Sequence, residues 1–543
     1  MKAQLKGNGD KEIEENYEEF ETDEPKKNKK KSKKNFSTIF SVLFLVVLII
    51  VLFYYIGNEN TTSSLSKEYT YELTTKCKTT DLDKMECKTC EPSDKLKDGK
   101  CILNHSFKAV YNTDEPNQKV SLFAIPDEAI DEMYIDDKKV DPVLSYTFPT
   151  AGDHAVLVKM NMKRCFTLGG MFNGNKNLIS IEFSPLFDSS KVNEMNFMFQ
   201  NCEKLTSVDV SNLNTQNVAF MEYMFSGCTS LKTLDVRNFK TENVEKMNSV
   251  FQGCSSLESI DLSTWNTKSM KNIEYLFARC TSLTSVNLSG FNTAKVEVMQ
   301  RVFFGCSSLK SLDLSSFDTQ NVRTMLGMFA GCTSLTSINL SSFKTPKLRN
   351  MEKMFRDCKN LTSIDLSNFE TKHVLRVSGL FSGCSSLVNY KLNISNSRHL
   401  VDFDYLFCDC KSLTSIDVSN FNTEDILSMK RTFSGCISLT SLDLSNFNTR
   451  NVERMENMFQ GCIGLTSIDI SNFETMNIEN LKGMFSGCKN LKYIDISGFT
   501  GEGTAKGILQ GVPDSGRIIV NKKLIDKIKK YTPKKWNVVL KEI

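Results

Sequence analysis

The sequence has little of what acid–base catalysis and metal binding use. Its 543 residues include four histidines and two tryptophans, and the formal net charge is only +3. The histidines are His105, His154, His373 and His399, and none lies in an HExxH motif or a Cys/His cluster with zinc spacing. There is no nucleophile–base pair and no phosphate-binding loop. We therefore expect no enzyme activity, no cofactor, no metal cluster and no nucleic-acid partner.

Long apolar runs are absent except for one near the N-terminus. Residues 36–57, FSTIFSVLFLVVLIIVLFYYIG, carry no charge and are long enough to cross ~30 Å of hydrocarbon. Residues 1–35 are acidic and then lysine-rich, so the positive-inside rule places them in the cytoplasm and the chain after Gly57 outside. A cleaved signal peptide would have a shorter apolar core and a small-residue exit. The pattern favours an uncleaved, single-pass anchor in the cell membrane.

Three short regions follow the anchor. Residues 58–70 form a polar linker, and residues 71–104 contain Cys77, Cys87, Cys90 and Cys101. Outside the cell this spacing is typical of a disulfide-bonded module, with three possible pairings. A zinc site is the alternative, because Cys87 and Cys90 have ligand spacing. Residues 105–163 predict a small β-rich unit, since short β-branched and aromatic runs alternate with turns.

A repeat of 26 residues fills most of the remaining chain. Residues 164–511 predict a solenoid, and residues 512–543, lysine-rich and amphipathic, predict its C-terminal cap with Trp536 buried. A weaker first copy begins at Cys165 and has Asn175 in the cysteine position. The in-phase cysteines are Cys202, Cys228, Cys254, Cys280, Cys306, Cys332, Cys358, Cys384, Cys410, Cys436, Cys462 and Cys488.

Each copy has two halves. The first reads like Leu439-x-x-Leu442-x-Leu444, a leucine-rich-repeat strand whose residue 443 points outward. In the second half, apolar residues at i, i+3, i+6 and i+7 predict a short helix, with Thr449 as its N-cap and a glycine as its stop. The expected fold is an α/β, curved, leucine-rich-repeat-like solenoid of about 13 strand-plus-short-helix coils. Helices are wider than strands, which favours a strand face on the concave side.

The repeated phrase MFxGCxSLTSLDLSNFNTxNVxxM resembles the BspA-like leucine-rich-repeat surface proteins. The resemblance covers roughly residues 165–511. It implies a cell-surface protein that binds other macromolecules, often in adhesion to host tissue or to other cells. It implies no catalytic residues, and it does not extend to the anchor or the four-cysteine module.

One outward strand position forms a column of acidic residues. Carboxylates one strand apart repel each other, so the column is either a solvated face bonded to flanking serines or a ligand-binding strip. The strip would suit a basic protein patch, Ca²⁺ or a glycan. Its members are Asp209, Asp235, Asp261, Asp313, Asp365, Lys391, Asp417, Asp443, Asp469 and Asp495, with Asn287 and Asn339 filling two positions.

The coil from Cys384 to Cys410 departs from the pattern. It has Ser395 in the phenylalanine position and Tyr390 in an inward position, and Lys391 lies between Asp365 and Asp417 in the column. Relief of column repulsion, a bend, a specific contact and ordinary drift remain open explanations.

The repeated cysteine is expected to point into the stack. Adjacent coils would bring the Cα atoms within disulfide range, but parallel Cβ vectors leave the Cβ atoms ~5 Å apart. We therefore expect a ladder of buried thiols that behave as small hydrophobes. Cys408 is the repeat-region thiol expected to be exposed.

These observations predict a membrane-anchored surface protein that binds an extracellular protein or glycan, for example in host matrix. A structural coat protein with lateral solenoid packing and a receptor-like sensor are the alternatives.

Overall fold

The computed structural model describes residues 105–541, apart from Arg164 and Arg398, and the backbone of four short strands before them. By its contacts the chain divides into Met1–Lys67 and Glu68–Ile543, and all described residues belong to the second unit. The predicted tail, anchor at 36–57 and linker lie outside the described residues, as do the four side chains of the cysteine module. In the part that is described, no helix is long and apolar enough to cross a bilayer. The four short strands pair antiparallel, β1 (Thr79–Asp81) with β2 (Glu86–Thr89) and β3 (Lys95–Lys97) with β4 (Lys100–Ile102).

A β-rich unit covers the beginning of the solenoid. Its central strand β5 (Ser106–Thr113) lies between β10 (Gly152–Met160) and β11 (Leu178–Phe183), which is the strand of the first coil. Side chains alternate along β5, so that Phe107 and Tyr111 are fully buried. The pairing with β5 removes the open strand edge that the first coil would otherwise present. The other elements of the unit are β6 (Gln118–Ser121), η1 (Asp127–Ala129), β7 (Ile130–Ile135), β8 (Lys138–Val140) and β9 (Ser145–Phe148).

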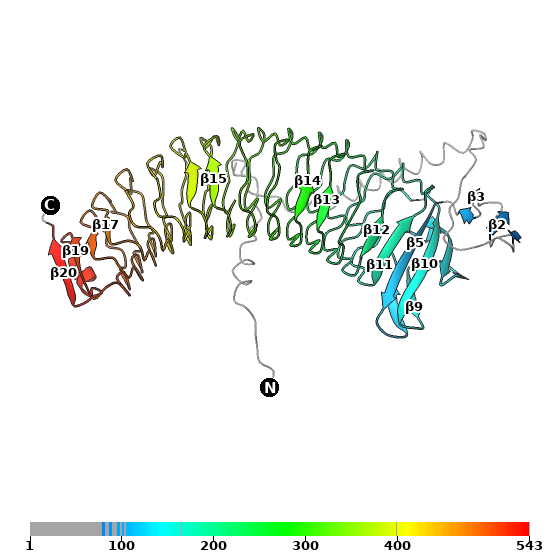
Figure 1. Cartoon of the computed structure of the whole chain (residues 1–543), viewed down its shortest axis with the longest axis horizontal. Coiled ribbons are helices and arrows are strands. Elements are labelled where there is room, and N and C mark those ends of the chain that lie inside the picture. The colour runs from blue at the N-terminus through cyan, green and yellow to red at the C-terminus, as the bar shows by residue number, and fades with distance from the viewer. Residues whose placement is uncertain are drawn as a thin grey trace, which may run out of the picture. The chain divides into compact units, whose positions relative to one another are not determined.

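The coils then follow one another in a continuous row (Figure 1). Where strands of adjacent coils form a ladder, they pair in parallel with residues 26 positions further on, as Ile260 does with Val286 and Ile364 with Tyr390. The predicted solenoid with its leucine-rich strands is confirmed in this respect. The named strands of the row are β12 (Ser207–Asp209), β13 (Ser259–Asp261), β14 (Ser285–Asn287), β15 (Ser363–Leu366), β16 (Asn389–Leu392), β17 (Ser467–Asp469) and β18 (Tyr493–Asp495).

The predicted helix in the second half of each coil is wrong. Two residues four positions apart have left-handed φ in every coil, for example Tyr223 at 57° and Gly227 at 76°. An α-helix cannot continue through such residues. The amides instead alternate: Met224 N donates to Met221 O in its own coil, and Phe225 N donates to Val250 O of the next coil. The second half is therefore a chain of tight turns. The expectation of a concave strand face rested on helices being wider than strands, and it loses that basis.

The predicted helix-capping threonine has another role. Thr215, which occupies the position of Thr449 in an earlier coil, is fully buried, and its Oγ1 donates to Lys240 O of the next coil at 3.1 Å. The same oxygen accepts a hydrogen bond from Lys240 N at 2.7 Å. The hydroxyl thus joins two coils at the corner between strand and turns, a position where an apolar side chain would leave both groups unpaired.

Identical side chains stack along the interior of the row. Phe303 and Phe329 lie with ring centroids 5.8 Å apart and nearly parallel planes, and Phe329 and Phe355 repeat the arrangement at 5.5 Å. No coil encloses its own apolar side chains, so neighbouring coils supply the core for one another.

The C-terminal region continues the sheet beyond the last coil. β19 (Ser515–Val520) pairs in parallel with β18, and β20 (Lys535–Leu540) pairs in parallel with β19. The short helix α2 (Ile525–Lys529) connects them. Trp536 is only 6% exposed, and its Nε1 donates to Pro513 O at 2.7 Å. These elements cover the last coil, and strands form most of this cap.

Candidate functional site

The acidic column lies on the strand face in the register that the sequence predicts. Asp261 is opposite Asn287, Asp365 is opposite Lys391, and neighbouring column positions are therefore one strand apart. In 11 of the 12 positions the side-chain oxygen accepts the backbone N–H two residues later. The distances run from 2.9 to 3.2 Å. This local turn requires an acceptor and not a charge, which explains why asparagine replaces aspartate twice.

The turn geometry also keeps the carboxylates charged. The Ser315 amide holds the pKa of Asp313 below its usual value, and the Ser445 amide does the same for Asp443. A hydroxyl contributes at Asp417, where Ser419 Oγ donates at 2.7 Å and lowers the pKa. Charge-assisted acceptance of this kind is stronger than a neutral hydrogen bond. Each turn engages one carboxylate oxygen, and the second oxygen can accept a bond from a ligand.

Two members of the column are paired with cations. Lys391 Nζ lies 2.7 Å from Asp365 Oδ2 and lowers the pKa of that carboxyl to about 2. Arg237 donates to Asp235 through Nε and Nη2 and likewise lowers its pKa to about 2. Both pairs are exposed, where such contacts add little stability. Both ion pairs lie in the first part of the column. In the described structure, the carboxylates that follow Lys391 in the column have no paired cation.

The strand face is hollowed in that stretch. A depression of about 340 Å³ lies over the extended segments 415–419 and 441–446 of two adjacent coils and brings the carboxyls of Asp417 and Asp443 to one site. Serine hydroxyls flank both carboxyls, and Ile416 and Leu442 contribute apolar surface. The full lining is Ser415, Ile416, Asp417, Val418, Ser419, Ser441, Leu442, Asp443, Ser445 and Asn446.

Asp495 does not belong to this exposed surface. It is 5% exposed and lies on β18, between β17 and the cap strand β19. Its oxygen still accepts the Ser497 amide at 2.9 Å. The cap thus ends the exposed column at Asp469, and the prediction that Asp495 contributes to the strip is wrong.

In the coil from Cys384 to Cys410, a residue that sequence reasoning missed takes the place of the absent core phenylalanine. Ile394, fully buried, bridges to Phe421, the residue that fills the phenylalanine position of the next coil. Ser395, which stands in the phenylalanine position by number, is exposed. Tyr390 lies between the rings of Phe381 and Phe407 and donates its hydroxyl to Asp417 O at 2.6 Å.

The repeated thiols are buried and unpaired in the structure. Each of the 12 is 0% exposed, and none forms a disulfide. Cys254 Sγ donates to Phe225 O at 3.1 Å, and burial raises its pKa to about 12. Cys408, which we expected to be exposed, is only 6% exposed, because its side chain is packed in the turn half of its coil. A thiol with so high a pKa is a poor nucleophile and metal ligand.

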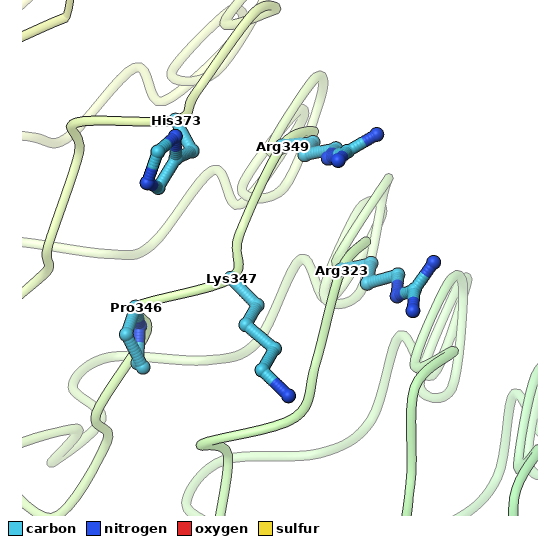
Figure 2. A pocket seen from close by; sticks show the side chains of 5 residues that line it. All are labelled: Arg323, Pro346, Lys347, Arg349 and His373. Carbon is cyan, nitrogen blue, oxygen red and sulfur yellow. The ribbon is translucent and has the colours of Figure 1, made fainter.

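A second polar cluster, of opposite charge, was missed from the sequence. Arg323, Lys347, Arg349 and His373 line a pocket of about 270 Å³ together with Pro346. Figure 2 shows the two arginines pointing the same way from adjacent coils. Aligning the repeats by position would have revealed the cluster, since Arg323 and Arg349, and also Lys347 and His373, are one 26-residue period apart.

Comparison with known proteins gives one family match. The family model described as "Mycoplasma protein of unknown function, DUF285" matches residues 144–234, 221–334, 277–396 and 401–502, which is more than half of the 543 residues. A solved structure of a leucine-rich repeat protein from Eubacterium ventriosum is similar over 61% of this chain and 90% of that one. The identity is 16% and the TM-score 0.30, too low to support an argument about function. No curated protein matches.

Proposed function

This chain belongs to the family described as Mycoplasma protein of unknown function, DUF285, and we propose that it is a binding protein of the cell surface. It is held in the membrane by residues 36–57, with the repeats outside the cell. Its strand face binds an extracellular macromolecule, and it works by binding and not by catalysis. The resemblance to BspA-like surface proteins supports adhesion to host tissue or to other cells as the purpose.

The observation that carries this proposal is the depression over Asp417 and Asp443. Two charged carboxylates lie at the same position of adjacent coils, each with an oxygen not used by its turn. Asp469 follows in the same column, on β17. Placing like charges side by side raises the free energy of the unbound face. A ligand with basic side chains relieves that repulsion, so a basic patch on an extracellular protein is the partner that fits best.

The test is a binding screen of the full chain in detergent against matrix proteins and cell surfaces. For any partner found, the triple variant Asp417→Asn, Asp443→Asn and Asp469→Asn should lower the affinity at least tenfold. Asparagine keeps the turn acceptor, as at Asn287 and Asn339, so the fold should not change. Asp318→Asn is the matched control, because Asp318 makes the same kind of turn outside the column. Unchanged affinity in the triple variant would refute the strand-face site.

The membrane anchor has a separate test. In fractionated cells, alkaline carbonate should leave the chain in the membrane pellet, and deletion of residues 36–57 should release it. Protease added to intact cells should remove the repeats. Self-association of the purified chain without any external partner would instead favour the coat-protein alternative.

A further inference from the structure

The cationic pocket is only partly neutralised by the protein. Arg323 Nε lies 3.2 Å from Glu297 Oε2, and Lys347 Nζ donates to Asn321 Oδ1 at 2.6 Å. Arg349 is exposed, and no carboxylate of the described residues pairs with it. The pocket therefore has unpaired positive charge centred on Arg349, next to a cavity that an anionic group can enter.

An exposed apolar stripe continues from this pocket. Leu375, Val401 and Leu427 are 37%, 40% and 43% exposed, and they occupy the same position as Arg349 in the next three coils. Backbone bonds hold two of the steps, Leu375 N to Arg349 O and Leu427 N to Val401 O, each at 2.8 Å. Isolated exposed leucines are ordinary, but exposed apolar residues at the same position of three successive coils are a mark of an interaction surface.

Acidic residues occupy the same position beyond the stripe. Glu453 N donates to Leu427 O at 2.9 Å, and Glu479 N donates to Glu453 O at 2.8 Å, so backbone bonds also join these two steps of the row. Both glutamates are exposed, and Glu453 has no ion pair among the described residues, whereas the charge of Glu479 acts on Arg454 and helps to raise its pKa. We call the sequence of cation, apolar stripe and acid the flank row: Arg323, Arg349, Leu375, Val401, Leu427, Glu453 and Glu479.

We propose that the flank row docks an extended segment of a partner protein that carries an acidic residue, two apolar residues and a basic residue at alternate positions. Arg349 pairs with the acid, the stripe packs against the apolar side chains, and Glu453 pairs with the base. This site is distinct from the strand face proposed above, and its partner has a different charge pattern.

The spacing of the row matches such a segment. Four coil steps separate Arg349 from Glu453, and at ~4.8 Å per step they span ~19 Å. In an extended peptide, side chains on one face recur every ~6.8 Å, so three such steps cover ~20 Å. Residues i, i+2, i+4 and i+6 of the segment therefore reach the arginine, the two ends of the stripe and the glutamate.

The stripe also favours a peptide over a sulfated polysaccharide. A polysaccharide would use the cationic pocket but has no large aliphatic side chains to cover the leucines, and its sulfates would meet Glu453 and Glu479 with like charge. A protein segment of the stated pattern matches all three zones. Because exposed ion pairs contribute only ~0–1 kcal/mol each, burial of the stripe has to provide much of the affinity.

The experiment uses the full chain in detergent and a surface densely coated with the peptide Glu-Ser-Leu-Thr-Leu-Thr-Lys. A peptide of the same composition in the order Leu-Leu-Glu-Lys-Ser-Thr-Thr is the sequence control, and immobilised heparin is the polysaccharide arm. Arg349→Gln and Leu375→Ser should each lower binding to the first peptide at least fivefold. The matched controls Arg450→Gln and Ile437→Ser change an exposed arginine and an exposed isoleucine outside the flank row and should leave binding unchanged.

Binding that prefers the ordered peptide and falls in both flank-row variants supports the proposal. Equal binding of the two peptides overturns it, as does binding that neither variant changes, or no binding to either peptide. Heparin binding that depends on Arg349 but not on Leu375, without peptide binding, also overturns it and identifies the pocket as a polysaccharide site. Folding of each variant is checked by circular dichroism, and since all four side chains are exposed, none should alter it.

Discussion

At the scale of single residues, the buried thiols are governed by desolvation. Burial raises the pKa of Cys202, Cys254 and Cys332 to about 12 in each case. The thiolate that reacts with disulfide reagents is therefore almost absent at neutral pH, and the sulfur is also covered. The cysteine position behaves as a packing position that donates one weak hydrogen bond.

This predicts the reactivity of the thiols. In the native chain, the 14 described cysteines should not react with Ellman's reagent at pH 8, and all 14 should react after denaturation without reductant. A denatured count below 14 would contradict the ladder, because it would reveal disulfides between coils.

Asp402 predicts a dependence of stability on pH. Burial raises its pKa from 3.8 to about 6, helped by the negative charges of Asp404 and Glu352, and its Oδ1 has no hydrogen-bond partner. The folded state therefore binds the proton more tightly than the unfolded state. Stability should be fully present below about pH 4, fall as pH rises towards 6 and stay reduced above it.

Asp402→Asn should remove this loss and stabilise the chain at pH 7 by about 1–3 kcal/mol, with little effect at pH 4. Urea denaturation at the two pH values measures it. The exposed Asp425→Asn in the next coil is the control and should show no such difference; equal curves for wild type and Asp402→Asn at pH 7 would contradict the assignment.

At the scale of elements, the strand half of the coil was predictable and the turn half was not. Alternation such as Leu442-x-Leu444, repeated every 26 residues, determines which side chains point inward, and the acidic column follows from it. The apolar spacing of the second half fits a short helix and a chain of turns equally well. Left-handed residues decide between them, and at Tyr223 or Lys353 the amino acid gives no sign of that conformation.

Of the candidate sites, too, one could be predicted from the sequence and the others could not be predicted as easily. The column could be read from one repeat position, whereas the cationic pocket needs two positions of adjacent coils to be compared. The core role of Ile394 could not be predicted. Ser395 stands in the phenylalanine position by number, and only the packing of the irregular coil determines that the preceding residue fills the core instead.

The left-handed positions predict opposite effects for two glycine substitutions. Lys353 has a φ of 54° where Gly327 and Gly379 occupy the same position in adjacent coils, and burial lowers the pKa of its amine. Lys353→Gly should stabilise the chain by about 0.5–1 kcal/mol. The left-handed conformation costs a non-glycine residue ~1–2 kcal/mol, and the larger loss of backbone entropy when glycine folds offsets part of the relief. Lys482→Gly, at a position without left-handed φ, should destabilise it. Urea unfolding measures both, and a loss of stability in Lys353→Gly would count against the strain.

At the scale of the whole solenoid, the ends determine solubility. β18 is paired on one side by β17 and on the other by β19, so removal of residues 512–543 would leave an unpaired parallel edge and uncover Ile494 and Ile496, both 0% exposed. The truncated chain should associate, eluting at higher mass than the full chain in the same detergent on size exclusion. A truncated chain that elutes at its expected mass would show that the last coil needs no cap.

The hydrogen bonds between coils in the turn half also give the row of coils a net dipole along its axis. Amides such as Tyr223 N and Phe225 N donate to the following coil, and the same sense holds at every second amide of this segment from Gly170 to Gly487. One amide per coil, such as Glu245 N, donates the other way, so the bonds towards the following coil are in the majority. Aligned peptide dipoles add, as they do along a helix axis, with the amide end partly positive and the carbonyl end partly negative. The amides of residues 505–511, in the last coil, have no further coil to receive them. Two such rows meeting end to end would therefore match donors to acceptors only head to tail, so any axial association is polar and not two-fold symmetric.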